Sequence, residues 1–518
     1  MTRAEQTPRG AIEEPATPGE LARFAELQAA LARSFSGTIE DPLAPRAVLV
    51  VPSLTLDAEV MAKISGVHHY EERMLCLLLL LRMPRTRVVY VTSTPVPQPI
   101  VDYYLHLLPG IPGEHARRRL TLIACEDAAP VPLTRKILER PRVLERMAGA
   151  IGDPAAAHMS CYTVTGLERK LALRLGIPIY GCDPALAAWG SKSGSRRIFR
   201  EAGIELPAGF EDLGGADDVA RALAELKAAR PGLRKAVVKL NEGFSGEGNA
   251  LFDFAGAPAG TALPPWVRAR LPRLAFEARG MAWETFEAKL AAMGGVVEEF
   301  VAGAEKRSPS AQLRIDPAGR IEAVSTHDQV LGGPTGQIFL GCRFPADAAY
   351  RLEVQKRALA AARCLAPRGV LGRFAVDFVS VREGERWRHL AIEVNLRKGG
   401  TTHPFQMLQF LTDGRYDPVT GGFATAAGRE ACYVATDNLE SPGYRGLTSR
   451  DLIDIAVLHG LHFHAATGEG VAFHLIGALS EFGKLGLLAI GHAPDRAEAL
   501  YRRTVAVLDA ETAAPAAS

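Results

Sequence analysis

Three side chains that carry oxygen ligands, Asp377, Glu393 and Asn395, fall on two neighbouring strand-like segments. The segments are RFAVDFVSV and HLAIEVNL, and the polar turn REGERW joins them into a predicted hairpin. Asp377 and Glu393 are about equally far from residue 385, so the hairpin sets their carboxylates roughly opposite each other. At roughly 5 Å and an effective dielectric of about 20, they would repel by about 3 kcal/mol. A hard divalent cation relieves this repulsion, which predicts a Mg²⁺ site that Mn²⁺ could also occupy. A hairpin with solvated acids is the alternative.

Two lysines and a glycine-rich loop are candidates for phosphate binding. Lys192 opens the predicted helix of GSKSGSRRIFREAG, and Lys239 ends the strand AVVK. The loop LNEGFSGEGN follows, and its glycines let backbone N–H groups approach phosphate oxygens closely. It is neither a Walker A loop nor a GxGxxG turn before a helix, and an ordinary turn is the alternative. The loop residues predicted to bind phosphate are Gly243, Ser245, Gly246 and Gly248.

A predicted buried strand in GVVEEFVAGAE ends in two acids followed by an apolar pair. An adenine ring suits this segment, because its faces are apolar and backbone groups can bond its edge. Glu305 could accept hydrogen bonds from ribose hydroxyls. A strand end with solvated acids is the alternative. The residues predicted to line the adenine site are Glu298, Glu299, Phe300 and Val301.

The first region of the chain must be a separate layer, because short apolar segments alternate there with helical ones. This pattern indicates a mainly parallel α/β sheet. The predicted strands are 47–51, 87–92, 120–124 and 159–165, and the predicted helices include 71–82 and 167–175. Ligands of such sheets bind at the strand ends, near 52–53, 93–97 and 163–166. His68, His69 and Glu71 are candidates for substrate contact, with an ordinary helix start as the alternative.

The later segments read less clearly. Residues 326–347 appear loop-rich, and Asp328 and Gln329 could shape a substrate pocket. Residues 430–510 predict a small α+β unit with a helix in SRDLIDIAVLHG, an apolar hairpin from VAFHLIGAL and LGLLAIGH, and a helix from Pro494. His459, His462 and His464 are interpreted as packing or surface residues and not as a zinc site, because no cysteine stands near them.

Composition bounds the class of protein. A chain of 518 residues predicts about three domains. With 47% hydrophobic residues and a net charge of +2, the chain is neither disordered nor a nucleic-acid-binding protein. Seven cysteines without a CxxC pair predict thiols in a cytoplasmic protein. The N-terminus has no apolar signal core, and the apolar run 75–81 is too short to cross a membrane.

Taken together, these motifs resemble the ATP-grasp superfamily in type, order and context over 188–405. The D-alanine–D-alanine ligases and the ribosomal-protein glutamate ligases are familiar members. More narrowly, EVNLRKGGTTHP and the C-terminal segment resemble the pheganomycin-type peptide ligases. The resemblance implies α/β and α+β architecture: a flexible N-terminus and Rossmann-like pre-ATP-grasp domain (1–187), an ATP-grasp domain (188–425), and a small C-terminal α+β domain with a flexible tail (426–518).

The resemblance also implies an activity, an ATP-dependent carboxylate–amine ligase. A carboxylate would take the γ-phosphoryl group of ATP, and an amine would then attack the acyl phosphate to form an amide, releasing ADP and phosphate. Arg373, and after it Arg397, are the candidates for stabilising the acyl phosphate, and Arg314 could reach the substrate acid. Where the alanine ligases have a serine–proline turn, this chain has RKGGTTH. The resemblance therefore does not identify the residues that bind the acceptor amine.

Several alternatives stay open at this point. The chain could be a catalytically silent ATP-binding sensor, or a ligase for small amino acids and not peptides. A silent binder, however, has no need of the full metal set. The C-terminal unit could contact the peptide or a second subunit in a homodimer. The sequence does not identify the carboxylate or the amine.

Overall fold

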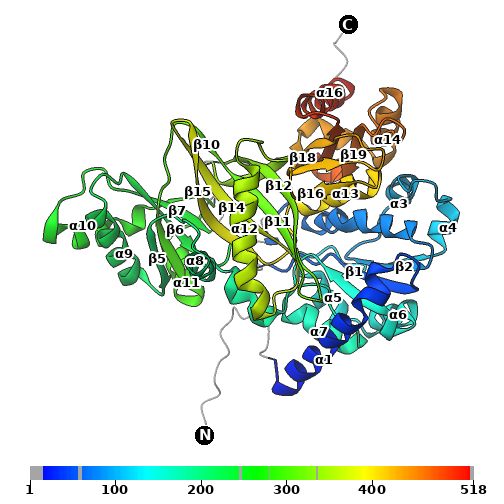
Figure 1. Cartoon of the computed structure of the whole chain (residues 1–518), viewed down its shortest axis with the longest axis horizontal. Helices are drawn as coiled ribbons and strands as arrows, with labels where there is room; N and C mark the ends of the chain where they lie inside the picture. Colours follow the sequence, from blue (N-terminus) through cyan, green and yellow to red (C-terminus); the bar gives the residue numbers. More distant parts are fainter. Residues whose placement is uncertain are drawn as a thin grey trace. The chain divides into compact units, whose positions relative to one another are not determined.

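The computed structural model describes residues 16–56, 61–62, 64–243, 248–278, 280–333 and 336–513 (Figure 1). These residues form two compact units. Unit 1 contains Met1–Pro184, Ser441–Asp454 and Leu475–Lys484, and unit 2 contains Ala185–Glu440, Ile455–His474 and Leu485–Ser518. The border after Pro184 lies close to the predicted end of the first domain, and segments of 426–518 belong to both units. The predicted division into three domains stays a prediction.

Unit 1 is built on a four-stranded sheet in the order β3-β2-β1-β4. All neighbouring strands are parallel, as predicted. The strands are β1 (Arg46–Val51), β2 (Thr86–Thr92), β3 (Leu120–Ala124) and β4 (Ala157–Cys161). The apolar runs of β1, β2 and β4 fit strands that are buried on both faces by crossover helices, whereas the edge strand β3 is partly exposed. Strand β4 ends at Cys161, earlier than predicted, because a bend and a turn lead from there into α7.

Unit 1 also contains the following helices, several of which share an apolar core with this sheet. They are α1 (Pro18–Phe35), η2 (Val67–Arg82), α3 (Gln98–His106), α4 (Gly113–Arg117), α5 (Leu133–Leu138), α6 (Pro141–Ile151), α7 (Gly166–Leu175), η8 (Pro442–Gly446) and α15 (Leu479–Phe482). The predicted helix 71–82 is present, but it begins at Val67 and is wound as a 3₁₀ helix. Its apolar run is buried, as predicted.

Unit 2 contains two large sheets. The first is antiparallel, in the order β5-β9-β6-β7-β8, and consists of β5 (Gly209–Leu213), β6 (Lys235–Leu240), β7 (Asn249–Asp253), β8 (Ala275–Phe276) and β9 (Gly295–Glu299). Helices α9 (Ala216–Ala229), α10 (Leu263–Arg270) and α11 (Trp283–Met293) share an apolar core with it. Val238, Leu223 and Phe286 lie in this core.

The second sheet has nine strands, in the order β10-β14-β11-β12-β13-β18-β20-β19, with β15 paired to β14. The strands are β10 (Lys306–Arg307), β11 (Pro309–Ile315), β12 (Ile321–Gly332), β13 (Ile338–Phe344), β14 (Gly372–Glu383), β15 (Arg386–Asn395), β18 (Cys432–Glu440), β19 (Gly470–His474) and β20 (Lys484–Gly491). The prediction of a loop-rich segment at 326–347 is therefore wrong. The segment contains parts of two strands, which its polar composition made look like a loop. Thr326 and His327 are polar, for example, but they are buried within β12.

Helices and a small hairpin complete unit 2. They are α8 (Lys192–Glu201), α12 (Arg351–Leu365), α13 (Thr402–Thr412), α16 (Pro494–Thr512) and the hairpin β16 (Arg415–Asp417) to β17 (Gly422–Ala424). Helix α12 packs on β11 and β12 (Figure 1), and α14 (Ser449–Leu458) spans the border between the units. The predicted C-terminal hairpin is confirmed as β19 paired with β20, although helical turns connect the two strands. No described helix is both long and apolar enough to span a bilayer.

Candidate active site

The β14–β15 hairpin positions the predicted metal ligands as expected. Asp377 pairs directly with Glu393, and Ala375 pairs with Asn395, with a bulge after Asp377. Because side chains alternate between faces, Phe374 and Phe378 are buried on the opposite face of β14. The two carboxylates therefore face the same side of the sheet at the same level.

The electrostatics of this pair favour a cation. Burial and the neighbouring carboxylate of Glu393 together raise the pKa of Asp377 to about 6, against the opposing effects of Ser310, Arg397 and Lys192. Asn395 Nδ2 donates to Asp377 Oδ2 at 2.9 Å, and Gln329 Nε2 donates to Oδ1 at 3.0 Å. Sequence reasoning had placed Gln329 in a loop; the structure brings it to the acid pair.

Lys192 reaches the same pair from helix α8. Its ammonium group donates to Glu393 Oε1. The helix is anchored to β15 by Ser195 Oγ, which accepts from the Val394 N–H at 2.9 Å. Its first turn leaves no room for a side chain at Gly194, where a Cβ would lie 1.9 Å from the Ala188 carbonyl oxygen. The sequence GSKSGS therefore fixes where Lys192 begins the helix.

Asn241 links the start of α8 to the end of strand β6. Its carbonyl oxygen accepts from the Lys192 N–H at 3.2 Å, and its Oδ1 accepts from the Ser193 N–H at 2.9 Å. Its Nδ2 donates to the Met293 carbonyl oxygen at 2.9 Å. Sequence reasoning missed this residue, because its role depends on two segments distant in the chain.

The second lysine, Lys239, lies near the end of β6 and contacts a buried acid. Its ammonium group donates to Glu298 Oε2, and Arg196 Nη1 donates to Glu298 Oε1 at 2.7 Å. Burial would raise the pKa of Glu298, but these two cations outweigh it and hold the pKa below its usual value. The Glu298 side chain thus contacts Lys239. Its place beside adenine stays a prediction. Arg196 was missed, although its i+4 spacing from Lys192 puts both on one helix face.

The remaining predicted nucleotide residues follow β9. Glu299 accepts from the Ala208 N–H at 3.0 Å and pairs with Arg230 at 2.8 Å. Phe300 and Val301 are half-buried, and Lys306 Nζ lies 4.9 Å from the Phe300 ring centre. Glu305 is paired at the surface with Arg307 and Arg382.

The glycine loop joins β6 to β7, and its two described glycines lie close together. Leu240 N–H donates to the Gly248 carbonyl at 2.9 Å, and a Cβ on Gly243 would lie 3.4 Å from the Gly248 backbone. Ser245 and Gly246 lie outside the described residues. The neck of the loop is therefore narrow and begins at Leu240, directly after Lys239.

The three predicted catalytic arginines differ in their contacts. Arg397 acts directly on the charge of Asp377. Arg373 shares the face of Asp377, but four residues along β14 place its Cα about 13 Å away, and its Nη2 donates to Gln409 at 3.4 Å. Arg314 pairs across strands with Arg373 and forms an ion pair with Glu322.

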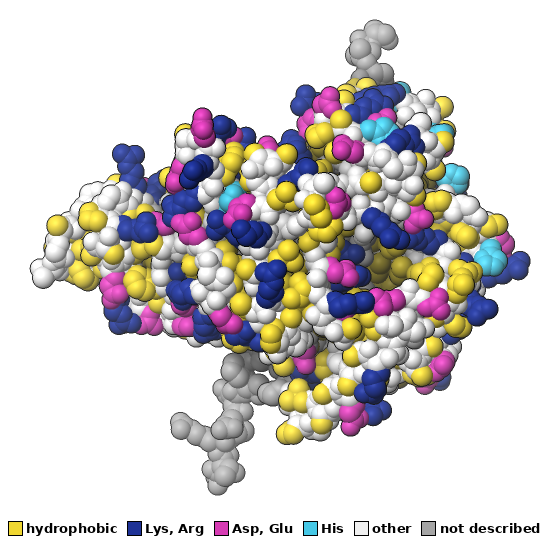
Figure 2. Space-filling view, viewed as in Figure 1, with side chains coloured by type: hydrophobic (Ala, Val, Ile, Leu, Met, Phe, Trp, Pro, Cys, Tyr) yellow, Lys and Arg dark blue, Asp and Glu magenta, His cyan; other side chains and the backbone are white. Residues whose placement is uncertain are grey.

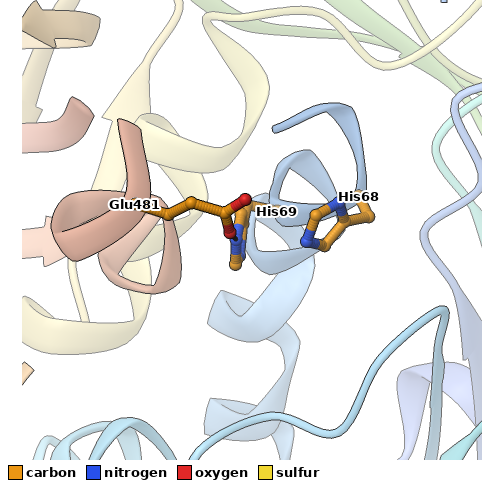
Figure 3. A group of neighbouring side chains, drawn as sticks. All are labelled: His68, His69 and Glu481. Atoms are coloured by element: carbon orange, nitrogen blue, oxygen red, sulfur yellow. Dashed lines mark ion pairs between the residues drawn. The ribbon is translucent and has the colours of Figure 1, made fainter. Parts of the chain in front are cut away.

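Unit 1 holds the other predicted substrate contacts. Glu71 is buried and accepts from the Ser93 N–H and hydroxyl, each at 2.6 Å, and burial raises its pKa to about 7. Lys136 Nζ donates to Ser93 Oγ at 2.9 Å. Together with His68 these residues line a pocket at the carboxyl end of β2. Figure 3 shows His69 between His68 and Glu481, its Nε2 3.9 Å from the carboxylate.

The chain is similar to known protein families and to known proteins. The family described as "IQCH-like, ATP-grasp" matches residues 184–260 and 260–419, and "PGM1 C-terminal domain" matches 451–504. The chain is 33% identical to an L-propargylglycine–L-glutamate ligase of Streptantibioticus cattleyicolor, over 87% of this chain and 91% of the relative. It is 23% identical to an IQ motif-containing protein H of Danio rerio, over 72% of this chain and 39% of that protein.

Solved structures show the same fold. A biotin carboxylase of Campylobacter jejuni superposes with a TM-score of 0.52 at 13% identity, covering 91% of this chain and 95% of that one. An N5-carboxyaminoimidazole synthetase of Staphylococcus aureus gives 0.50 at 10% identity, covering 89% and 97%. The predicted fold and family are thus confirmed. The chain belongs to the ATP-grasp superfamily and is an ATP-dependent carboxylate–amine ligase that resembles the pheganomycin-type peptide ligases.

Proposed function

We propose that this enzyme joins two amino acids, or an amino acid and a short peptide, with Mg²⁺ held by Asp377, Glu393 and Asn395. The observation that carries the metal assignment is the opposed carboxylate pair, because burial and the repulsion by Glu393 together raise the pKa of Asp377. Two carboxylates and an amide oxygen are the hard ligands that Mg²⁺ prefers, and Mn²⁺ would also fit them. The ligase relative from Streptantibioticus cattleyicolor, which is named for two amino acids, supports an amino-acid substrate class.

The side chains support a two-step reaction. Lys192 and Lys239 would exchange their present carboxylate partners for phosphate oxygens of ATP. A bound Mg²⁺ supplies positive charge to the phosphate oxygens. A substrate carboxylate oxygen then attacks the γ-phosphorus, and the bond to the β-phosphate oxygen breaks to release ADP. The amine nitrogen attacks the acyl carbon, loses a proton, and phosphate departs.

Arg397 is the arginine best supported for stabilising the acyl phosphate and the oxyanion that follows. It lies close enough to influence Asp377, whereas Arg373 is displaced along the strand and Arg314 pairs with Glu322. The contacts therefore favour Arg397 over Arg373, which reverses the order suggested by the sequence. The adenine role of Phe300 and Val301 and the ribose role of Glu305 complete the proposal.

The decisive experiment measures ADP release with Mg²⁺ and ATP across pools of amino acids and dipeptides, with mass spectrometry of the product. Glu393→Gln should lower substrate-dependent ADP release by about 100-fold or more, because one hard ligand is lost. Glu383→Gln is the matched control, since it lies on the same hairpin with an exposed side chain, and should keep nearly full activity. Equal activity in both variants would refute the assignment of Glu393. ADP release without an amide product would refute the proposal that the enzyme joins amino acids or short peptides.

We also propose the cellular location of the enzyme and the kind of partners that it has. The seven cysteines are present as thiols, which supports a reducing, cytoplasmic location. Basic and acidic side chains are interspersed over the face seen in Figure 2, in keeping with small-molecule substrates. A homodimer stays a prediction that sedimentation equilibrium would test.

A further inference from the structure

Three buried side chains outside the ATP site converge on one point in unit 2. His403 is the second residue of α13, Asp437 lies in β18, and His474 is the last residue of β19. Each is only 4% exposed. They come from three segments that the fold brings together, and neither the proposed reaction nor the nucleotide site uses them.

Their ligand atoms form a nearly equilateral triangle. Asp437 Oδ1 lies 2.7 Å from His474 Nε2 and 3.1 Å from His403 Nε2, and the two nitrogens are 3.0 Å apart. Protons alone cannot make all three contacts favourable, because each imidazole nitrogen is either a donor or an acceptor. If both nitrogens donate to Asp437, their N–H groups oppose each other. If one nitrogen accepts, its lone pair faces the carboxylate oxygen.

A cation above the centre of the triangle makes all three contacts favourable. For metal–ligand bonds of about 2.1 Å at right angles, the ligand atoms are about 3.0 Å apart, which matches the three observed edges. Two imidazole nitrogens and one carboxylate oxygen suit Zn²⁺, Fe²⁺, Co²⁺ or Ni²⁺ better than Mg²⁺. We propose that His403, Asp437 and His474 bind a divalent transition-metal ion, at a site separate from the Mg²⁺ site.

The surrounding structure is built to hold these rings. Gly486 pairs with His474 across strands, and a Cβ there would lie 2.2 Å from the imidazole. Gln312 holds the start of α13, donating to the Thr401 carbonyl at 2.8 Å and accepting from the Thr402 hydroxyl at 3.0 Å. The ion would therefore tie α13 to two strands of the large sheet and restrain the segment 396–401, which connects Asn395 to this helix.

The test is the metal content of the full-length protein, purified without a metal-affinity tag after loading with Co²⁺ and dialysis. Elemental mass spectrometry should find about one equivalent of Co²⁺ per wild-type chain. A large excess of Mg²⁺ should not displace this Co²⁺. His403→Gln and His474→Gln should each weaken Co²⁺ binding at least about tenfold. The matched controls are His459→Gln, which removes a surface histidine paired with Glu511, and Glu393→Gln; both should retain the ion.

Clear results would overturn the proposal. Folded wild type that retains less than about a tenth of an equivalent of Co²⁺ would refute it, as would unchanged binding in both histidine variants. Should those variants fail to fold, X-ray absorption at the Co²⁺ edge of wild type decides, because two imidazole ligands must appear. A spectrum without imidazole scattering would refute the site.

Discussion

Asp377→Asn should make the metal-free enzyme more stable while it destroys activity. The pKa of Asp377 is raised from 3.8 to about 6, so the folded state binds a proton more tightly than the unfolded state does. Between these values stability falls as the pH rises, because the unfolded chain releases its proton first. From the two pKa values, keeping this carboxylate in the folded state costs less than about 1 kcal/mol at pH 4 and roughly 3 kcal/mol at pH 7.

The asparagine removes this cost but loses one acceptor. Asp377 accepts hydrogen bonds on both oxygens, from Gln329 and Asn395, whereas asparagine offers one oxygen. Losing one bond costs about 1 kcal/mol, so the net gain at pH 7 should be about 2 kcal/mol, and near pH 4 the variant should be slightly less stable than wild type.

The assay is urea unfolding of both proteins in EDTA at several pH values from 4 to 8. The difference in unfolding free energy between variant and wild type cancels the titration of all other groups and should rise by roughly 2 kcal/mol over this range. Adding Mg²⁺ and ATP should stabilise wild type and leave the variant nearly unchanged. A difference that stays flat with pH, or a variant that is less stable at pH 8, would refute the electrostatic reasoning.

Three further predictions follow from buried contacts. Glu298→Ala should destabilise the protein by about 3–5 kcal/mol, because it leaves Lys239 and an arginine buried without their counter-charge; a loss below about 1 kcal/mol in chemical denaturation would contradict this. Gly194→Ala should destabilise by more than about 2 kcal/mol, since its Cβ would overlap a backbone oxygen, and a normal Tm would show that the helix start can shift. Arg397→Met should lower kcat at least about 100-fold and Arg373→Met much less; the opposite order in steady-state kinetics would restore Arg373 as the main candidate.

Much of the fold and the pairing of the two carboxylates could be predicted because their signals are local. The parallel strands of unit 1 are short apolar runs, and Asp377 meets Glu393 through a single hairpin whose turn is visible in the sequence. The segment 326–347 was misread because its strand residues are polar. Their polarity is explained by contacts that no local pattern reveals, such as the Gln329 bond to Asp377.

Contacts between distant segments were the part that sequence could not supply. The buried group of Arg196, Lys239 and Glu298 joins three elements. The sequence drew attention to the histidines at 459, 462 and 464, which are close in the chain. The histidines that converge are instead His403 of helix α13 and His474 of strand β19, which are separated by 71 positions in the chain. Hydrophobic periodicity predicts a helix or a strand, but it carries no information on which buried polar side chains will contact each other.

The two lysines that we propose to bind ATP already hold internal counter-ions. Lys192 pairs with Glu393, and Lys239 pairs with Glu298. In the proposed ATP complex each lysine would exchange a protein carboxylate for a phosphate, and few ions would be released to the solvent. The affinity for ATP should therefore depend less on salt concentration than two free lysines would imply. The same pairing protects the site from abundant inorganic anions, because a single sulfate or chloride ion would have to compete with a tethered carboxylate at each lysine.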